Sequence, residues 1–161
     1  MLEALKKNGV RGKVWRIVDR MYTGNSTKIT LGGELSEKYP VETGLREGSV
    51  LSPILYSCFI NSILTDLESY APECGIQLEP GLHVRALLYA DDIVLMADSP
   101  VQLQKMLEVA QSHADRGQYQ FSVPKRDAEG KVTSSGKSQI VVFGENAITV
   151  DKFMLHGVEL E

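Results

Sequence analysis

The sequence predicts an α+β fold in which helices pack on one face of an antiparallel sheet. Two observations predict this class. Strand-like segments alternate with short turn signals, so the strands come in hairpins, and hairpins give antiparallel pairs because parallel neighbours need a long crossover. Ser52-Pro53 and Ser99-Pro100 mark helix starts between the hairpins, because serine caps free N–H groups and proline tolerates the first helical position. The length of 161 residues is that of one domain.

Four segments are predicted as helices because apolar residues recur at a spacing of three and four between start and stop signals. They are residues 2–8, a segment from Gly12 to the stop at Gly24-Asn25, residues 52–70 and residues 100–116. The second helix is predicted to have one apolar stripe, formed by Val14, Ile17, Val18, Met21 and Tyr22. The apolar sides of the last two helices consist of Ile60, Ile63, Leu64 and Leu67, and of Leu103, Met106, Leu107 and Ala110.

The remaining apolar segments are predicted as strands because they are short and bounded by glycine and proline. They are residues 28–31 and 34–41 around Gly32-Gly33, residues 75–79 and 82–90 around Pro80-Gly81, residues 93–97, residues 139–143, and short strands near Ile148 and Phe153. Residues 126–136 are charged and rich in Gly and Ser, which predicts a flexible loop.

The composition excludes several classes of protein. With 43% hydrophobic and 24% charged residues, the chain is not expected to be disordered. No apolar run approaches the ~18 residues of a membrane helix, and the first residues do not form a signal peptide. Cys58 and Cys74 form neither a close metal-ligand pair nor a disulfide framework, which favours a reducing compartment. We therefore expect a soluble, intracellular protein without a membrane partner.

Charge is distributed unevenly along the chain. The net charge of −4 argues against a self-sufficient nucleic-acid binder, because such proteins present a basic face. Residues 1–28, however, contain seven basic and two acidic side chains and carry a net charge of +5, whereas the other residues carry −9. A basic segment of this kind either faces phosphates or is an ordinary solvated helix face.

The pair Asp91-Asp92 between two predicted apolar strands is the most informative dipeptide. Adjacent anions repel, and apolar flanks screen that repulsion less than water does. A tight turn does not require two aspartates, because Asn-Gly suits it better. A hard cation such as Mg²⁺ relieves the repulsion by binding carboxylate oxygens. From these residues alone two interpretations remain: a metal site at the tip of a hairpin, or an ordinary turn with exposed aspartates.

A second motif runs from Gly44 to Pro53 and reads Gly-Leu-Arg-Glu-Gly-Ser-Val-Leu-Ser-Pro. Gly44 and Gly48 permit unusual backbone angles and the close approach of another backbone. The segment leads into a helix N-terminus, where N–H groups and the helix dipole favour phosphate. By itself the pattern fits both a phosphate-binding loop and an ordinary loop that enters a helix.

Together the two motifs resemble those of a known family. The segment from Gly44 to Tyr56 followed by Tyr89-Ala-Asp-Asp92 is similar to the reverse transcriptases of non-LTR (LINE-type) retrotransposons. The resemblance covers most of the chain and implies an incomplete, polymerase palm-like fold, a fragment of the palm domain. The implied parts are residues 1–43, which connect fingers and palm, residues 44–123, the palm core, residues 124–137, a flexible insertion, and residues 138–161, the truncated end of the palm.

The resemblance also implies an activity and its residues. The family copies RNA into DNA with two Mg²⁺ ions, which activate the primer 3′-hydroxyl and steady the triphosphate. It makes Asp91 and Asp92 the catalytic metal ligands and places Tyr89 near the primer end. The residues expected along the template and the incoming nucleotide are Arg46, Glu47, Gly48 and Ser49. Lys137 is either a contact of the triphosphate or an exposed lysine at a strand end. The implied partners are an RNA template, a DNA primer and deoxynucleoside triphosphates, in the nucleus or the cytoplasm.

Three departures from the family pattern set further expectations. Glu47 stands where most members have Gln, and an acid there repels phosphate. Residues 126–136 look like an insertion, which leaves Lys125 and Lys137 as rivals for one role. The essential aspartate of an earlier strand has no counterpart, because Asp19 lies in a predicted helix. The isolated chain is therefore expected to bind Mg²⁺ weakly or not at all, to be inactive, and to self-associate through an exposed sheet edge.

Two other functions are compatible with the sequence. One is a non-catalytic remnant that binds nucleic acid or protein, for which the basic segment 1–28 is the support. The other is an unrelated α+β protein in which Asp91-Asp92 holds a hydrolytic metal. That function needs further ligands, and the three histidines are scattered at His83, His113 and His156. It would be favoured if the aspartates lay beside His83 and another carboxylate.

Overall fold

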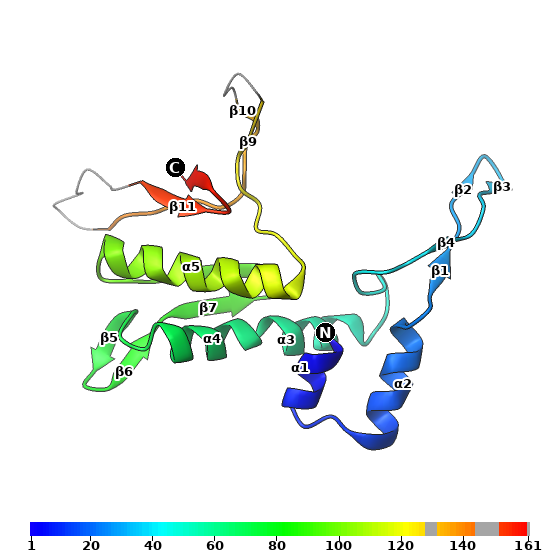
Figure 1. The fold of residues 1–161 in the computed structure, drawn as a ribbon, viewed down its shortest axis with the longest axis horizontal. Coiled ribbons are helices and arrows are strands. Elements are labelled where there is room, and N and C mark those ends of the chain that lie inside the picture. Colours follow the sequence, from blue (N-terminus) through cyan, green and yellow to red (C-terminus); the bar gives the residue numbers. More distant parts are fainter. Residues whose placement is uncertain (128–131, 144–151, 161) are drawn as a thin grey trace. The chain divides into compact units, whose positions relative to one another are not determined.

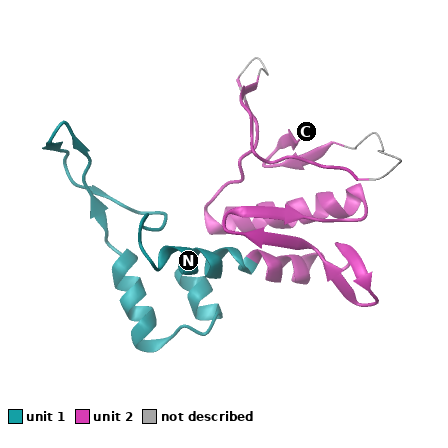
Figure 2. Ribbon diagram, turned by 180° about the vertical axis from the view of Figure 1, so that it is seen from behind, with its two compact units in different colours: residues 1–62 teal, residues 63–161 magenta. Residues whose placement is uncertain are grey.

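The computed structural model describes residues 1–127, 132–143 and 152–160. The chain divides into two compact units, residues 1–62 and residues 63–161, which Figure 2 distinguishes by colour. Both contain helices and short antiparallel strand pairs, which confirms the predicted α+β class. None of the helices within the described residues is long and apolar enough to cross a membrane.

Helices and strands alternate along the chain (Figure 1). The helices are α1 (Leu2–Lys7), α2 (Gly12–Tyr22), α3 (Ser52–Ile60), α4 (Ser62–Tyr70) and α5 (Pro100–Gly117). The strands are β1 (Ser26–Thr27), β2 (Thr30–Leu31), β3 (Glu34–Leu35), β4 (Tyr39–Pro40), β5 (Ile76–Glu79), β6 (Leu82–Val84), β7 (Ala86–Tyr89), β8 (Asp92–Leu95), β9 (Lys125–Arg126), β10 (Val132–Ser134), β11 (Phe153–Leu155) and β12 (Val158–Leu160).

The strands form antiparallel pairs, as predicted, and each pair is local in the sequence or closes around another pair. The pairs are β1–β4, β2–β3, β5–β6, β7–β8, β9–β10 and β11–β12, and within the described residues no hydrogen-bonded ladder joins one pair to another. The predicted antiparallel pairing is therefore present, as small two-stranded sheets in this part of the chain. Each strand has two to four residues, which is enough to close a hairpin but presents only a short edge to a further strand.

Unit 1 is built around three helices. Leu5 of α1, Val18 of α2 and Leu55 of α3 form its buried core. The predicted hairpin after α2 is confirmed in shorter form, because β2 pairs with β3 across Gly32-Gly33. Both strands of this hairpin are exposed, so they contribute little to the core.

Helix α2 has two apolar faces instead of the single stripe that was predicted. Its core side consists of Trp15, Val18 and Tyr22, which pack with residues of α1 and α3. The other apolar residues are exposed to solvent by 60%, 50% and 42%, and they are Val14, Ile17 and Met21. Helical spacing does not separate the two sets, because burial depends on which side of α2 its neighbours cover.

The structure interrupts the predicted helix 52–70 at Asn61, so that α3 and α4 follow one another. The Ser62 hydroxyl donates a hydrogen bond of 2.8 Å to the Phe59 carbonyl. Such local side-chain bonds compete with the main-chain ladder and interrupt helices. Of the predicted apolar side, three residues are buried and one is 37% exposed; the buried ones are Ile60, Ile63 and Leu67, and the exposed one is Leu64.

The two predicted serine caps have different outcomes. Ser99 caps α5, since its hydroxyl accepts a hydrogen bond of 3.3 Å from the Gln102 N–H. The prediction for Ser52 is wrong, because the N-cap of α3 is Leu51. The Ser52 hydroxyl donates instead to the Arg46 carbonyl over 2.6 Å. This side chain therefore closes the loop before α3 rather than the first turn of the helix.

In unit 2, α4 and α5 pack on one face of the β7–β8 pair (Figure 1). The strand residues that face the helices alternate along the sequence, as the period of two requires, and they are Ala86, Leu88, Ile93 and Leu95. The largest fully buried side chains among the described residues are Ile63, Leu67, Met106 and Cys74. The helices thus cover one face, as predicted, of a hairpin that has two strands.

Predictions for the chain beyond α5 are met only in part. The predicted strand at 139–143 is wrong, because these residues pair with no strand in the described part of the chain, and Phe143 is 91% exposed. The region 126–136, predicted as a loop, contains pairing between β9 and β10 at its ends. The strand predicted near Phe153 is confirmed as β11, and the one predicted near Ile148 lies outside the described residues.

Candidate active site on the β7–β8 hairpin

Residues 82–90, predicted as one strand, form two. The chain divides after β6, so that β6 pairs back with β5 and β7 pairs forward with β8. In the second pair Tyr89 lies opposite Asp92, which leaves Ala90 and Asp91 as a two-residue turn. The expectation that both aspartates form the turn is therefore corrected by one residue: Asp91 lies in the turn and Asp92 begins β8.

The turn contains a strained residue. Ala90 has a φ of +50°, in the left-handed region that costs about 1–2 kcal/mol for a residue with a side chain. Tight two-residue hairpin turns require such angles and normally place glycine there. Strained backbone of this kind persists only where the surrounding structure enforces it, and it is enriched at functional sites. The residue directly before Asp91 is thus held in place at a cost in stability.

The side chains of the hairpin alternate between the helix-covered face and an outer face. The outer face consists of Leu87, Tyr89, Asp92 and Val94, all exposed to solvent. Tyr89 is 83% exposed, and as the cross-strand partner of Asp92 it stands beside that carboxylate on the same face. The hairpin therefore presents a phenol and a carboxylate together, with Asp91 at the adjoining tip.

The carboxylates of Asp91 and Asp92 are accessible to a ligand. Both residues are exposed, and within the described residues neither side chain has a hydrogen bond or an ion pair. Hard oxygen donors of this type match Mg²⁺, which binds one or two carboxylates and completes its shell with water and substrate phosphates. Across the described ranges, no group of three or more His, Cys, Asp or Glu residues gathers into a metal-binding cluster. The two carboxylates therefore fit Mg²⁺ as two of its ligands, with water and substrate phosphates as the others.

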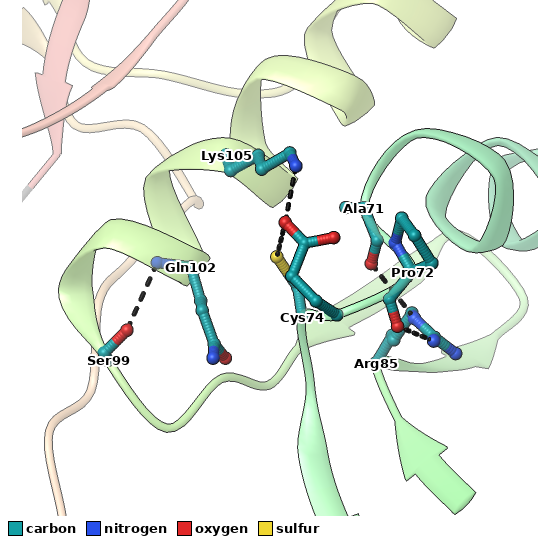
Figure 3. A network of polar contacts seen from close by, with 8 residues as sticks. Ala71, Pro72, Cys74, Arg85, Ser99, Gln102 and Lys105 are labelled. Carbon is teal, nitrogen blue, oxygen red and sulfur yellow. Dashed lines mark hydrogen bonds and ion pairs between the residues drawn. The ribbon is translucent and has the colours of Figure 1, made fainter. Parts of the chain in front are cut away.

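A polar network holds the base of the hairpin to the clamp segment, residues 71–75 (Figure 3). Arg85, directly before β7, donates from Nε to the Ala71 carbonyl over 3.2 Å and from Nη2 to the Pro72 carbonyl. The carbonyl of Arg85 accepts a hydrogen bond of 2.8 Å from the Met96 N–H. Because the clamp segment follows α4 directly, one arginine links the end of α4 to the start of β7 and to the end of β8.

A second cation connects the clamp segment to α5. Lys105 Nζ lies 2.5 Å from the Glu73 carboxylate, and this contact lowers the pKa of Glu73 and raises the pKa of Lys105. Gly75 has a φ of +109°, and a Cβ there would lie 2.8 Å from the Arg85 side chain and from the Val84 carbonyl. Glycine therefore lets Arg85 approach the segment closely. The clamp segment is thus bonded to Arg85, directly before β7, and to Lys105 of α5, the helix that follows β8.

The glycine-rich motif belongs to unit 1. Gly44 and Gly48 have φ values of +92° and +73°, which other residues adopt only with strain. Arg46 and Glu47 are exposed, and their side chains have no bonded partner within the described residues, whereas Ser49 is half-buried. The loop therefore presents one cation and one anion to solvent.

The structure brings together only some of the predicted site residues. Asp91, Asp92 and Tyr89 share one hairpin. Lys137 is exposed, and its backbone N–H donates to the Ser122 carbonyl over 2.9 Å. In the part of the chain that the structure describes, no hydrogen bond or ion pair joins the Lys137 side chain to the hairpin.

Comparison with known proteins shows the family of the chain. Residues 2–134 match the family model described as reverse transcriptase (RNA-dependent DNA polymerase). The chain belongs to the reverse transcriptase family. It is 25% identical over 107 residues, 66% of this chain, to a retrovirus-related Pol polyprotein from the type-1 retrotransposable element R2 of Popillia japonica. It is 32% identical over 91 residues, 56% of this chain, to the Pol polyprotein from the type-2 element R2DM of Drosophila melanogaster.

These relatives are much longer than the chain. The aligned residues span 17% of the Popillia japonica protein and 8% of the Drosophila melanogaster protein. The resemblance to non-LTR retrotransposon reverse transcriptases is confirmed by the family match and by these retrotransposable-element relatives. Reverse transcriptases generally use Mg²⁺ and act on template and primer strands. The residues of the β7–β8 hairpin are therefore considered below as ligands of that metal and as contacts of those strands.

The sequence of this reverse transcriptase chain did not predict the contacts of the clamp segment. Within that segment they involve Glu73 and Gly75, and their partners are Lys105 and Arg85. One signal in the sequence was the break from Pro72 to Gly75, which indicates the end of a helix but not the hydrogen-bond partners of that segment. An arginine inside an apolar strand-like segment was a further clue, because a cation there needs acceptors.

Proposed function

We propose that the chain forms part of the catalytic palm of an RNA-directed DNA polymerase, with Asp91 and Asp92 as catalytic metal ligands. The observation that supports this function is the β7–β8 hairpin, whose strained turn presents two unpaired carboxylates beside the exposed Tyr89. The inner face of the hairpin packs on α4 and α5, so the carboxylates stand on a packed support, as a site of defined geometry requires.

The roles of the hairpin residues follow from their chemistry. When bound, Mg²⁺ supplies Lewis acidity to a primer 3′-hydroxyl and neutralises charge on a triphosphate. Asp91 and Asp92 hold the metal through their carboxylate oxygens. Tyr89 offers an exposed ring next to Asp92 against which the primer end packs. The strain at Ala90 fixes the direction in which the tip projects.

The glycine-rich loop is proposed to contact the template and the incoming nucleotide. The exposed Arg46 supplies positive charge, Gly48 supplies a backbone N–H group and Ser49 supplies its hydroxyl as donors to phosphate, since the Ser49 N–H already donates to the Arg46 carbonyl. Glu47 repels phosphate, so its role is to accept hydrogen bonds from a base or an N–H group. Lys137 is the proposed contact of the triphosphate. The partners are thus an RNA template, a DNA primer and deoxynucleoside triphosphates.

The metal assignment is tested by Mn²⁺ or Mg²⁺ titration followed by backbone NMR of the 161-residue chain. We expect weak binding whose shifts and line broadening centre on residues 89–93. Asp91→Asn and Asp92→Asn should each remove the effect, whereas Asp98→Asn, at another exposed aspartate outside the hairpin strands, should leave it intact. Metal effects that persist in both hairpin variants, or that vanish equally in the control, would contradict the assignment.

We expect the chain by itself not to polymerise, because its described residues place only two carboxylates at the hairpin and gather no third metal donor there. Template-directed primer extension with Mg²⁺ checks this expectation. Extension that depends on Asp91 would refute the expected inactivity, although it would support the role of that residue.

A hydrolytic metal site involving His83 gains no support, since His83 lies opposite Gln77 in the β5–β6 pair.

A further inference from the structure

Helix α2 presents a cationic face that the proposed polymerase site does not use. The cationic face consists of Lys13, Arg16 and Arg20, which fall within about 60° of one another at the helical repeat of 3.6 residues per turn. All three are exposed and lie opposite the core side of α2. None has an ion pair in the described part of the chain. The acid of this helix, Asp19, accepts a hydrogen bond from the Thr23 hydroxyl over 3.2 Å.

The positive charge around α2 contrasts with the rest of the chain. Residues 1–28 carry a net charge of +5 and the remainder carries −9. The cations rise along the axis in steps of about 4.5 Å and 6 Å at ~1.5 Å per residue, which is of the same order as the ~3.4 Å axial spacing of phosphates along a strand. A row of cations without internal partners suits a polyanion, because neutralising phosphates releases their condensed counterions.

A second exposed stripe runs beside the cationic face. This apolar stripe consists of Val14, Ile17 and Met21, which are 60%, 50% and 42% exposed. A second copy of α2 is a poor partner for the apolar stripe, because the neighbouring cations of the two copies would face each other. A duplex keeps its bases stacked inside and offers mainly phosphates. A single strand offers both phosphates and unstacked sugar and base faces.

We propose that α2 binds a single-stranded nucleic acid, with phosphates on the cationic face and sugar and base faces against the apolar stripe. The proposal rests on the proposed function, in which the chain works on RNA and DNA strands. It adds a contact surface outside the β7–β8 hairpin and the glycine-rich loop. The surface acts without Mg²⁺, because its cations contact phosphate directly.

The test is the binding of a fluorescein-labelled oligouridylate of about 20 nucleotides, a length that exceeds common single-strand site sizes. Anisotropy is recorded on the whole chain in EDTA, as a function of salt. The test variant is Lys13→Gln/Arg16→Gln/Arg20→Gln. The control variant, Lys38→Gln/Arg116→Gln/Lys152→Gln, removes the same charge at three exposed positions outside the basic segment 1–28 and outside the proposed nucleotide contacts. Far-UV circular dichroism checks that both variants keep their helices.

Three phosphate contacts contribute about 2 to the slope of log K against log salt for a single strand. We therefore expect the wild-type affinity to fall about sixteen-fold more than that of the test variant between about 50 and 200 mM salt. The control variant should keep the wild-type slope. Equal slopes for the test and control variants would overturn the proposal, and so would displacement of the oligonucleotide by polyglutamate as readily as by unlabelled oligouridylate.

The apolar stripe provides a second, independent arm. Ile17→Ser/Met21→Ser should weaken binding of the single strand several-fold and leave binding of a duplex of the same length unchanged. Val101→Ser, at a residue that is 77% exposed on α5, is the matched control. Equal losses for both nucleic acids, or no loss for either, would overturn the single-strand assignment. Failure of the proposed function appears in the metal titration of Asp91 and Asp92, which this metal-free assay does not involve.

Discussion

Replacing Arg85 with methionine tests whether the clamp segment holds the hairpin that presents Asp91 and Asp92. The substitution keeps an aliphatic side chain of similar length but removes the hydrogen bonds to the Ala71 and Pro72 carbonyls. It leaves the backbone bond from Met96 intact. The expected loss is therefore confined to the link between the end of α4 and the start of β7.

The size of the effect follows from the two acceptors. A hydrogen bond to a charged group contributes about 1.5–3 kcal/mol, and both bonds here have alternatives that reduce the loss. The Ala71 carbonyl keeps a hydrogen bond of 3.1 Å from the Cys74 N–H, and the exposed Pro72 can bond to water. We expect Arg85→Met to lower the free energy of unfolding by about 1.5–2 kcal/mol. With an m-value of about 1–3 kcal/mol/M, the urea midpoint falls by about 0.5–2 M.

The assay is urea unfolding monitored by far-UV circular dichroism, together with hydrogen exchange of the backbone amides. Protection should fall most in β7 and β8. Arg116→Met is the control, because it removes an exposed ion pair with Asp66 that contributes about 0–1 kcal/mol. Trp15, the single tryptophan, reports separately on unit 1. An Arg85→Met midpoint equal to that of the control, or protection lost no more in β7 and β8 than in α5, would refute the reasoning.

Three further outcomes are expected. Ala90→Gly should stabilise the chain by about 1 kcal/mol in the same urea assay, because glycine relieves the positive φ, and a destabilised variant would contradict the assigned strain. The stability difference between the wild type and Glu73→Gln should be constant above the ordinary Glu pKa of 4.5 and vanish as pH falls through the lowered pKa of Glu73, and this pH dependence should shrink in a Lys105→Met background, which lacks the partner of Glu73. The expected self-association through the exposed edge of the β7–β8 pair should be visible by sedimentation velocity at low micromolar concentration and reduced in Leu87→Ser/Val94→Ser, which removes two exposed apolar side chains of that pair; a monomeric wild type would contradict it.

Local signals predicted several elements correctly. Ser99-Pro100 marks the start of α5 because the cap and the proline act within one turn of the helix. Gly32-Gly33 marks the turn between β2 and β3 for a similarly local reason. The predicted strand at 139–143 failed because a strand needs a partner, and partners are long-range. Ser52 failed as a cap because the Arg46 carbonyl, six residues earlier, takes its hydroxyl.

For the candidate site, too, contiguous motifs were visible in the sequence and long-range contacts were not. The family resemblance and the paired carboxylates were visible in the Tyr89-Ala-Asp-Asp92 run and the glycine-rich motif, because these chemical groups are contiguous in sequence. The burial of one side of α2, with Ile17 left exposed, was not visible there. Helical periodicity identifies apolar residues on a helix but does not indicate which of them a neighbouring element will cover.

The sequence by itself determined the α+β class, the reverse transcriptase family and the hairpin that presents the aspartates, because local propensity and contiguous motifs specify them. Only the tertiary structure decided that Asp91 occupies the turn while Asp92 begins β8 beside Tyr89. It also decided that Arg85 bonds to carbonyls 13 and 14 residues away. The physical reason is that register and such long-range hydrogen bonds depend on how α4, α5 and the hairpin pack together, which no local pattern of residues specifies.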